Sequence, residues 1–143
     1  MNEGPQRIAA RIPKGVRCAI ALSYDLEMCA GYAPAGINHG RIMPALQAYA
    51  LRLCGLAEDY GARLQIFLVC EALEQSDIGY LEEIVDRGHS IDSHTYSHQH
   101  LATTSPTALD EELSRANRLL QEKLDIHSTV LRGPYGYDLG WRN

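Results

Sequence analysis

The stretch RLQIFLVC, Arg63 to Cys70, is a short β-branched and apolar run that predicts a buried strand. Amphipathic helices are predicted on both sides of it. One runs from about Arg41 to Tyr60 and ends before Gly61, a natural C-cap, and the other runs from Asp77 to Arg87 and stops at Gly88. Alternation of strands and helices argues for a parallel sheet with crossover helices, so the sequence predicts an α/β fold.

The same alternation continues on both sides of this unit. Further strands are predicted at Cys18 to Asp25 and at Ser128 to Gly133, with a weaker candidate at His89 to His94. A third amphipathic helix, near Thr107 to Leu124, opens after a proline. The Gly/Pro-rich segment Cys29 to Gly40 predicts a long loop after the first strand. Because no repeat or second pattern intervenes, we expect one domain over residues 1–143.

Composition excludes several partners. The chain has 13 Lys+Arg against 18 Asp+Glu, a net charge of −5, and lacks a basic run, which argues against nucleic acid. It shows neither the apolar stretch of a signal peptide nor the roughly 18 apolar residues of a membrane span, so we expect a cytoplasmic protein without a membrane partner. The cysteines form no CxxC pair and are expected to be reduced and buried; they are Cys18, Cys29, Cys54 and Cys70.

Chemically active side chains follow the predicted strands. The first strand ends at Asp25 and Glu27, the third runs into His94 and His98, and the fourth ends at Arg132. In parallel sheets and barrels, sites gather at the carboxyl ends of the strands. Two carboxylates, two imidazoles and an arginine are therefore expected to converge at one end of one sheet.

The stretch SHTYSHQH, Ser93 to His100, holds three of the six histidines. Four residues apart, His94 and His98 would lie on one face of a helical turn, with about 5–6 Å between Cβ atoms, so both could reach one divalent ion. A carboxylate from the first strand would complete a set with open positions for water and substrate, as catalytic metal sites require. The alternative is a pair of solvated histidines on a surface turn. His100 breaks the spacing, and His89 is expected to pack against the strand it begins.

Three motifs resemble those of a known family. SYDLE (residues 23–27), SHTYSH (93–98) and RGPYG (132–136) resemble the TFDDG, HxxxH and RxPYG motifs of polysaccharide deacetylases of the NodB-homology type, also called carbohydrate esterase family 4. Their order and their placement at strand ends also match, over about Cys18 to Gly136. The resemblance implies a deformed (β/α) barrel of the NodB type, of which this chain would be an incomplete part.

The resemblance also implies roles for individual residues. Asp25 matches the general base, and His94 and His98 match the two imidazole ligands of a divalent metal. Zn²⁺ is the metal that we expect. Arg132 matches the arginine that orients the base and pairs with its charge. The backbone N–H of Tyr135 matches a donor to the oxyanion. From the residues alone, the carboxylate could instead cap a turn, the arginine could form a surface ion pair, and PYG could be merely a turn.

Two departures from the family pattern bear on these roles. Leu26 stands where the metal-binding aspartate usually follows the base, and the next carboxylate is Glu27. Along a regular strand Glu27 would face the same side as Asp25, which permits it to be the third ligand. The later family motifs, which supply a groove wall and a general-acid histidine, would follow Gly136, but the chain ends at Asn143. We therefore expect a C-terminally truncated domain whose unpaired outer strands favour self-association.

The expected activity is hydrolysis of a C–N amide bond other than a peptide bond, by metal-dependent N-deacetylation of an amino sugar or polysaccharide. The expected partner is an N-acetylated carbohydrate or a small amide. One alternative is an allantoinase-like hydrolase of small amides that works without metal. Another is an inactive metal-binding or interaction fragment.

Overall fold

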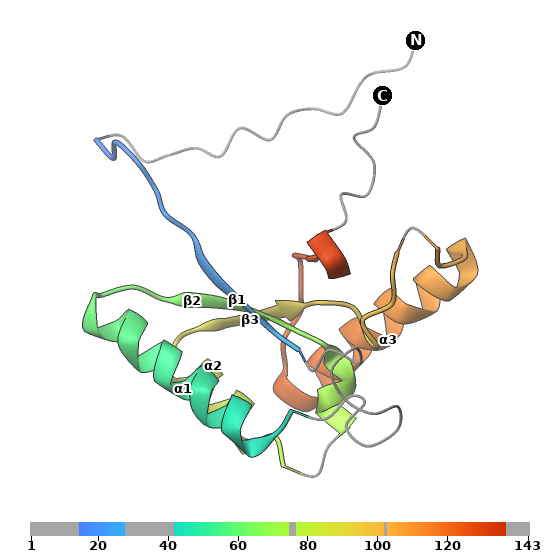
Figure 1. Cartoon of the computed structure of the whole chain (residues 1–143), viewed down its shortest axis with the longest axis horizontal. Coiled ribbons are helices and arrows are strands. Elements are labelled where there is room, and N and C mark those ends of the chain that lie inside the picture. The colour runs from blue at the N-terminus through green and yellow to red at the C-terminus, as the bar shows by residue number, and fades with distance from the viewer. Residues whose placement is uncertain (1–14, 28–41, 75–76, 102, 137–143) are drawn as a thin grey trace.

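A computed structural model of the chain describes residues 15–27, 42–74, 77–101 and 103–136 (Figure 1). Strands and helices alternate along these residues, as the sequence predicts. The elements are β1 (Leu22–Leu26), α1 (Pro44–Asp59), β2 (Leu64–Leu68), the 3-10 helix η1 (Cys70–Glu74), α2 (Gly79–Asp86), β3 (Ser90–Ser93), α3 (Pro106–Leu124) and the 3-10 turn η2 (Pro134–Gly136).

The strands form a parallel sheet in the order β1-β2-β3, which confirms the predicted α/β class. Two strand predictions need correction. β1 begins at Leu22 because this residue pairs with Leu64, the first residue of β2; residues 18–21 lie beyond that point and are exposed. The expected fourth strand is reduced to one parallel bridge between Leu131 and Ser93; next to this bridge, Ser93 N–H donates to the hydroxyl of Ser128 (3.3 Å).

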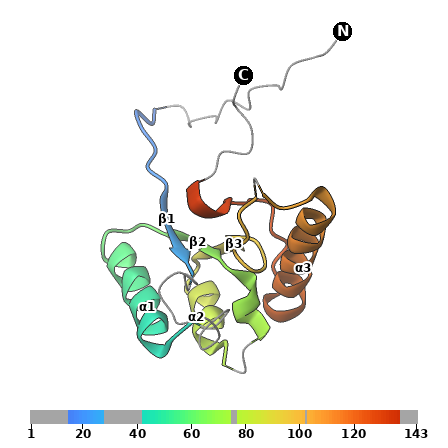
Figure 2. The same ribbon diagram turned by 45° about the vertical axis from the view of Figure 1, so that its right-hand side comes forward.

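The three α-helices lie on one side of the sheet, α1 and α2 next to each other and α3 beside β3 (Figure 2). The hydrophobic core fills the space between the helices and the sheet. Its most deeply buried members include Leu26, Ile66, Leu68, Leu81, Ile84, Ile91 and Leu120. Because side chains alternate along a strand, the other face receives the residues in between, among them Asp25, Gln65 and Asp92. Asp25 therefore lies on the face opposite the helices.

The helix ends follow the sequence signals. Gly61 and Gly88 come directly after the C-caps of α1 and α2, and their φ angles of 67° and 82° are in the left-handed region that glycine tolerates. Ser105 is the N-cap of α3, and its hydroxyl accepts the N–H of Ala108 (3.3 Å). No helix in the described part of the chain is long and apolar enough to cross a membrane.

An ionic cluster closes the amino end of the sheet. His89 is buried, as expected, and its Nδ1 accepts the N–H of Leu64 (3.0 Å) while its Nε2 contacts Glu58 (2.9 Å). Arg87 donates to both oxygens of Glu58, each at 3.0 Å. These bonds from Arg87 and His89 lower the pKa of Glu58 from 4.5 to about 2. The cluster therefore joins α1 to α2 and β3 at the end of the sheet away from the strand-end motifs.

The cysteines of the described residues carry free thiols, and two of them, Cys54 and Cys70, are buried as expected. Cys18 is exposed, which corrects the expectation for that residue, because the described residues before β1, 15–21, do not join the core. Cys29 lies outside the described residues. Burial raises the pKa of the Cys70 thiol to about 12, so it stays protonated at neutral pH.

Candidate active site

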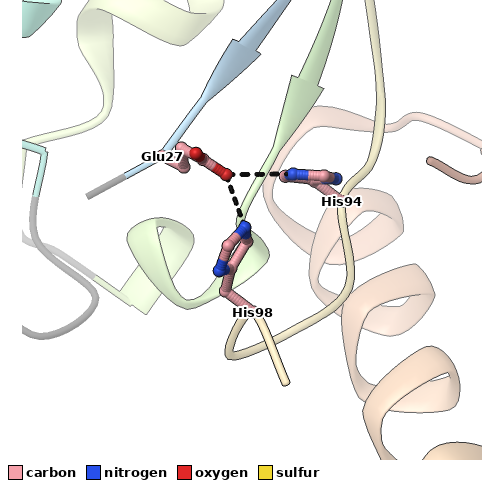
Figure 3. A group of neighbouring side chains, drawn as sticks. All are labelled: Glu27, His94 and His98. Atoms are coloured by element: carbon pink, nitrogen blue, oxygen red, sulfur yellow. Dashed lines mark hydrogen bonds and ion pairs between the residues drawn. The ribbon is translucent and has the colours of Figure 1, made fainter. Parts of the chain in front are cut away.

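Three candidate ligands meet at the carboxyl ends of β1 and β3 (Figure 3). Glu27 directly follows β1, and His94 directly follows β3. The Oε2 atom of Glu27 lies 3.0 Å from His94 Nε2 and 2.5 Å from His98 Nε2. One ligand atom from each side chain lies within 4.8 Å of the others. The structure thus brings together the three residues that the sequence singled out as metal ligands.

The hydrogen bonds of His94 reveal what this cluster needs. Its Nδ1 lies 2.8 Å from the carbonyl oxygen of Arg132, which can only accept, so the ring proton is on Nδ1. In the neutral ring, Nε2 then presents a lone pair to the carboxylate of Glu27, and two electron-rich atoms face each other. A metal cation between the two atoms removes this conflict, as does a second proton on the ring. Metal-binding histidines usually donate a hydrogen bond from the other ring nitrogen to a carbonyl or a carboxylate, as His94 does here.

His98 points to the same conclusion. Its Nε2 is buried and makes no hydrogen bond of acceptable geometry with any residue that the structure describes, although it lies close to Glu27. Burial lowers the pKa of His98, and the nearby His94 adds to this effect, while Glu27 opposes it. The neutral imidazole that burial favours is the form that binds metal. Two imidazoles and one carboxylate fit a divalent cation of the Zn²⁺ class.

The loop between the two histidines corrects one prediction. His94 and His98 do not share the face of a helical turn, since Thr95 and His98 have φ angles of 68° and 59°, in the left-handed region. The carbonyls of Thr95 and Tyr96 accept N–H groups of η1, at 3.0 and 2.9 Å, in place of helical bonds within the loop. The imidazole centroids nevertheless lie 5.0 Å apart, so this turn places the two histidines side by side, as the predicted helix would have done.

Arg132 connects the candidate base to the ligand cluster. Its guanidinium contacts Asp25 Oδ1 (2.5 Å), donates to the hydroxyl of Ser23 (2.7 Å), and lies over the ring of Phe67, 4.1 Å from its centroid. Its carbonyl oxygen is the acceptor for His94. The charge of Asp25 is also close enough to raise the pKa of His98, against the effect of burial. The carboxylate expected to be the base therefore lies beside the ligands and is held in place.

Tyr135 forms the outer part of the site. Its ring packs against His98, with centroids 4.7 Å apart, and stacks on His100 at 5.4 Å. His100 is exposed, as expected for a residue outside the ligand set. The φ angle of Tyr135 is 62°, a strained conformation of the kind that gathers at functional sites. Its backbone N–H as an oxyanion donor stays a prediction.

Sequence reasoning missed two side chains of the site. Ser23 lies in the first motif and could have been found there, since β1 places it on the same face as Asp25. Glu112, on α3, accepts both the N–H and the hydroxyl of Ser97 in the loop between the histidines. Glu112 gave no local signal, because it is one of several acidic residues on an amphipathic helix.

Solved structures with a similar fold belong to carbohydrate esterase family 4 (CE4). A family 4 acetyl xylan esterase from Clostridium thermocellum is 18% identical, with a TM-score of 0.60, over 82% of this chain and 49% of that one. A peptidoglycan deacetylase from Bacillus subtilis is 18% identical, with a TM-score of 0.62, over 82% and 50%. A CE4 pseudoenzyme from Bacillus anthracis is 16% identical, with a TM-score of 0.62, over 81% and 35%. The chain thus spans about half, or less, of the length of these structures, and it shares part of their NodB-type barrel fold.

Sequence comparison is more direct. No curated protein matches the chain. The family described as polysaccharide deacetylase does match, over residues 37–139, which include both histidines of the cluster and the RGPYG motif. This match covers most of the sequence and agrees with the fold and the motifs, so the chain belongs to the polysaccharide deacetylase family.

Proposed function

We propose that this chain hydrolyses the C–N bond of an N-acetyl group on a carbohydrate, with a divalent metal held by Glu27, His94 and His98. The observation that carries the proposal is the convergence of three ligand atoms within 4.8 Å, next to the Asp25–Arg132 pair. Membership of the polysaccharide deacetylase family supports the reaction class. Zn²⁺ suits a set of two imidazoles and one carboxylate.

Each residue of the site has a task in this reaction. A divalent ion bound there supplies Lewis acidity, which makes a nearby water a stronger acid and the amide carbonyl a better electrophile. Asp25 accepts the proton of the attacking water, while Arg132 holds the carboxylate in place. The backbone N–H of Tyr135 donates to the oxygen that becomes negative. Breaking the C–N bond leaves an amine that needs a proton, and the protonated Asp25 holds one.

The choice of an N-acetyl carbohydrate is supported by relatives of the same fold. One similar structure is a peptidoglycan N-acetylglucosamine deacetylase, and another is an acetyl xylan esterase, which acts on an ester. Amide and ester cleavage share the attack of water on an acetyl carbonyl, and they differ in the leaving group. A direct comparison of chitin oligosaccharides with acetylated xylan therefore tests this part of the proposal.

A second candidate function is metal binding without catalysis. Leu26, fully buried, stands where the family pattern has its metal-binding aspartate, and the ligand is displaced to Glu27. The fold similarity does not separate the two candidates, because the CE4 pseudoenzyme and the peptidoglycan deacetylase have the same TM-score of 0.62. Turnover with bound metal is the result that distinguishes them.

The test combines metal analysis with hydrolysis assays on the full chain. We expect one equivalent of Zn²⁺ per chain, and its loss in His94→Ala and in His98→Ala. His127→Ala is the matched control, since His127 is exposed and outside the cluster. Acetate release from chitin oligosaccharides that stops on chelation and returns with Zn²⁺ would support the proposal. One equivalent of metal retained by the double variant His94→Ala/His98→Ala would refute the assigned ligands.

A further inference from the structure

The loop that carries His98 is in a conformation that needs outside support. Thr95 and His98 both have positive φ angles, 68° and 59°. For residues with a Cβ, this conformation costs roughly 1–2 kcal/mol each, and it persists where surrounding contacts impose it. The position of His98 therefore depends on what holds the loop.

Two groups of contacts hold it. The first half is attached to the sheet and to η1: Thr95 N–H donates to Ser93 Oγ (3.2 Å), and Thr95 O accepts the N–H of Cys70 (3.0 Å). The second half is attached to α3. Ser97 N–H donates to Glu112 Oε2 (2.8 Å), and Ser97 Oγ donates to Glu112 Oε1 (2.6 Å). Both oxygens of one carboxylate thus bind the residue that immediately precedes His98.

The helix that supplies Glu112 is itself firmly placed. Arg115 lies over the Tyr96 ring, 3.8 Å from its centroid, and pairs with Glu74 (2.6 Å). The Tyr96 hydroxyl donates to the same Glu74 (3.1 Å). The apolar side of α3 is buried in the core through Ala116, Leu119 and Leu120. Glu112 therefore fixes the loop relative to a helix that is itself packed in the core.

The two histidines differ in how they are oriented. His94 is fixed directly, by the carbonyl of Arg132 on its Nδ1. His98 is placed by its backbone: its N–H donates to Thr95 Oγ1 (3.1 Å), and Ser97 before it is bound by Glu112. Loss of the Glu112 bonds would free Ser97 and let the strained turn relax, so that His98 Nε2 would move away from Glu27.

We infer that Glu112 is a positioning residue of the proposed metal centre, which acts through Ser97 to hold His98 in the ligand geometry. The inference rests on the proposed function, because it assumes that His98 binds the metal. Charge–dipole bonds from a carboxylate to N–H and O–H are stronger than neutral ones, which suits a role in imposing a strained backbone. Outer partners of this kind typically change metal affinity by about 10- to 100-fold when removed.

Titration of the full chain with Co²⁺ and Zn²⁺ tests this inference, with the visible absorption of bound Co²⁺ reporting its geometry. The variants are Glu112→Ala, Glu112→Gln and Ser97→Ala, with Glu122→Ala as the control, an exposed carboxylate on the same helix. Thermal melting without metal measures the purely structural effect. Ser97→Ala removes only the hydroxyl bond and keeps the test open if Glu112→Ala fails to fold.

We expect Glu112→Ala to bind Co²⁺ at least about 10-fold more weakly, with an altered spectrum, while Glu122→Ala matches the unmodified chain. Glu112→Gln should recover much of the affinity, because its amide oxygen accepts the Ser97 N–H and its amide nitrogen donates to Ser97 Oγ. Unchanged affinity and spectrum in Glu112→Ala, or in Ser97→Ala if that variant alone folds, would overturn the inference and leave the proposed function intact. Absence of metal binding by the unmodified chain would overturn both.

Discussion

Replacing Asp25 by Asn separates a catalytic role from a structural one. Asp25 and Arg132 lie 2.5 Å apart, with 34% and 37% of their side chains exposed, so solvent screens the pair. Ion pairs of this kind contribute about 0.2–1 kcal/mol to stability, and Asn retains an oxygen that accepts from Arg132. A positioned general base contributes about 10²- to 10⁴-fold in rate, which is roughly 3–5 kcal/mol of activation free energy. The predicted effect on activity is therefore several times the effect on stability.

The assays follow from this difference in size. For Asp25→Asn we expect kcat/KM for a chitin oligosaccharide to fall by about 10²-fold or more, with the bound metal retained and the melting temperature lowered by only a few degrees. Glu27→Gln is the companion variant, because an amide is a much poorer metal ligand than a carboxylate. It should lose metal and activity together. Each variant is measured for metal content, acetate release and thermal melting.

Three outcomes would refute the reasoning in different ways. Metal lost from Asp25→Asn and kept by Glu27→Gln would mean that the two carboxylates have each other's role. Full activity in Asp25→Asn would remove Asp25 as the base. If neither substitution changed metal content or turnover, the assignment of this end of the sheet as a metal centre would fail.

Other predictions concern the rest of the molecule. The pKa of Glu58 is lowered to about 2, so its contribution to stability is present above pH 4.5 and is lost as the pH falls toward 2. Glu58→Gln should therefore flatten the fall of the unfolding free energy between these pH values. An unchanged slope would contradict this prediction. Ile84→Ala leaves a cavity at a fully buried core position and should lower the unfolding free energy, measured in urea, by about 2–5 kcal/mol. Leu56→Ala, at a 54% exposed position, should lower it much less. Equal losses of unfolding free energy would argue against this core. At pH 8, a thiol reagent should label Cys18 quickly, and Cys70, whose pKa is raised to about 12, only after unfolding; fast labelling of Cys70 in the folded chain would contradict its burial.

Much of the fold could be predicted because the relevant signals are local. The apolar run at residues 63–70 contains β2, and the glycines at 61 and 88 mark the ends of α1 and α2. The ends of the strands depend on partners instead. β1 starts at Leu22 because its partner strand β2 starts at Leu64. The composition of residues 18–21 gives no sign of this limit. The segment after residue 127 has strand-like composition, but it pairs with β3 through one bridge, and local composition does not report how far a segment pairs.

The sequence predicted three side chains that the structure brings together, Glu27, His94 and His98, and did not predict the local geometry of the loop that carries the histidines. HxxxH spacing indicated a shared helical face, whereas the histidines converge through a left-handed turn held by Ser93, Glu112 and the N–H groups of η1. These partners are distant in sequence or ordinary in type, so periodicity could not report them. The family motif was the more reliable guide, because it records which residues meet and is silent on the backbone path between them.

Arg132 shows why a motif and a structure carry different information about the same residue. Its contacts with Asp25 and Ser23 run through the guanidinium, so they depend on arginine at this position. Its contacts with the ligand side of the site run through the main chain: the N–H donates to Ser93 O (3.1 Å) and the carbonyl accepts from His94. A motif can register only the first set of contacts, since any residue except proline supplies the main-chain N–H and carbonyl of the second set. The support of His94 therefore depends on the path of the chain through Leu131 and Arg132, and the support of the base depends on the side chain.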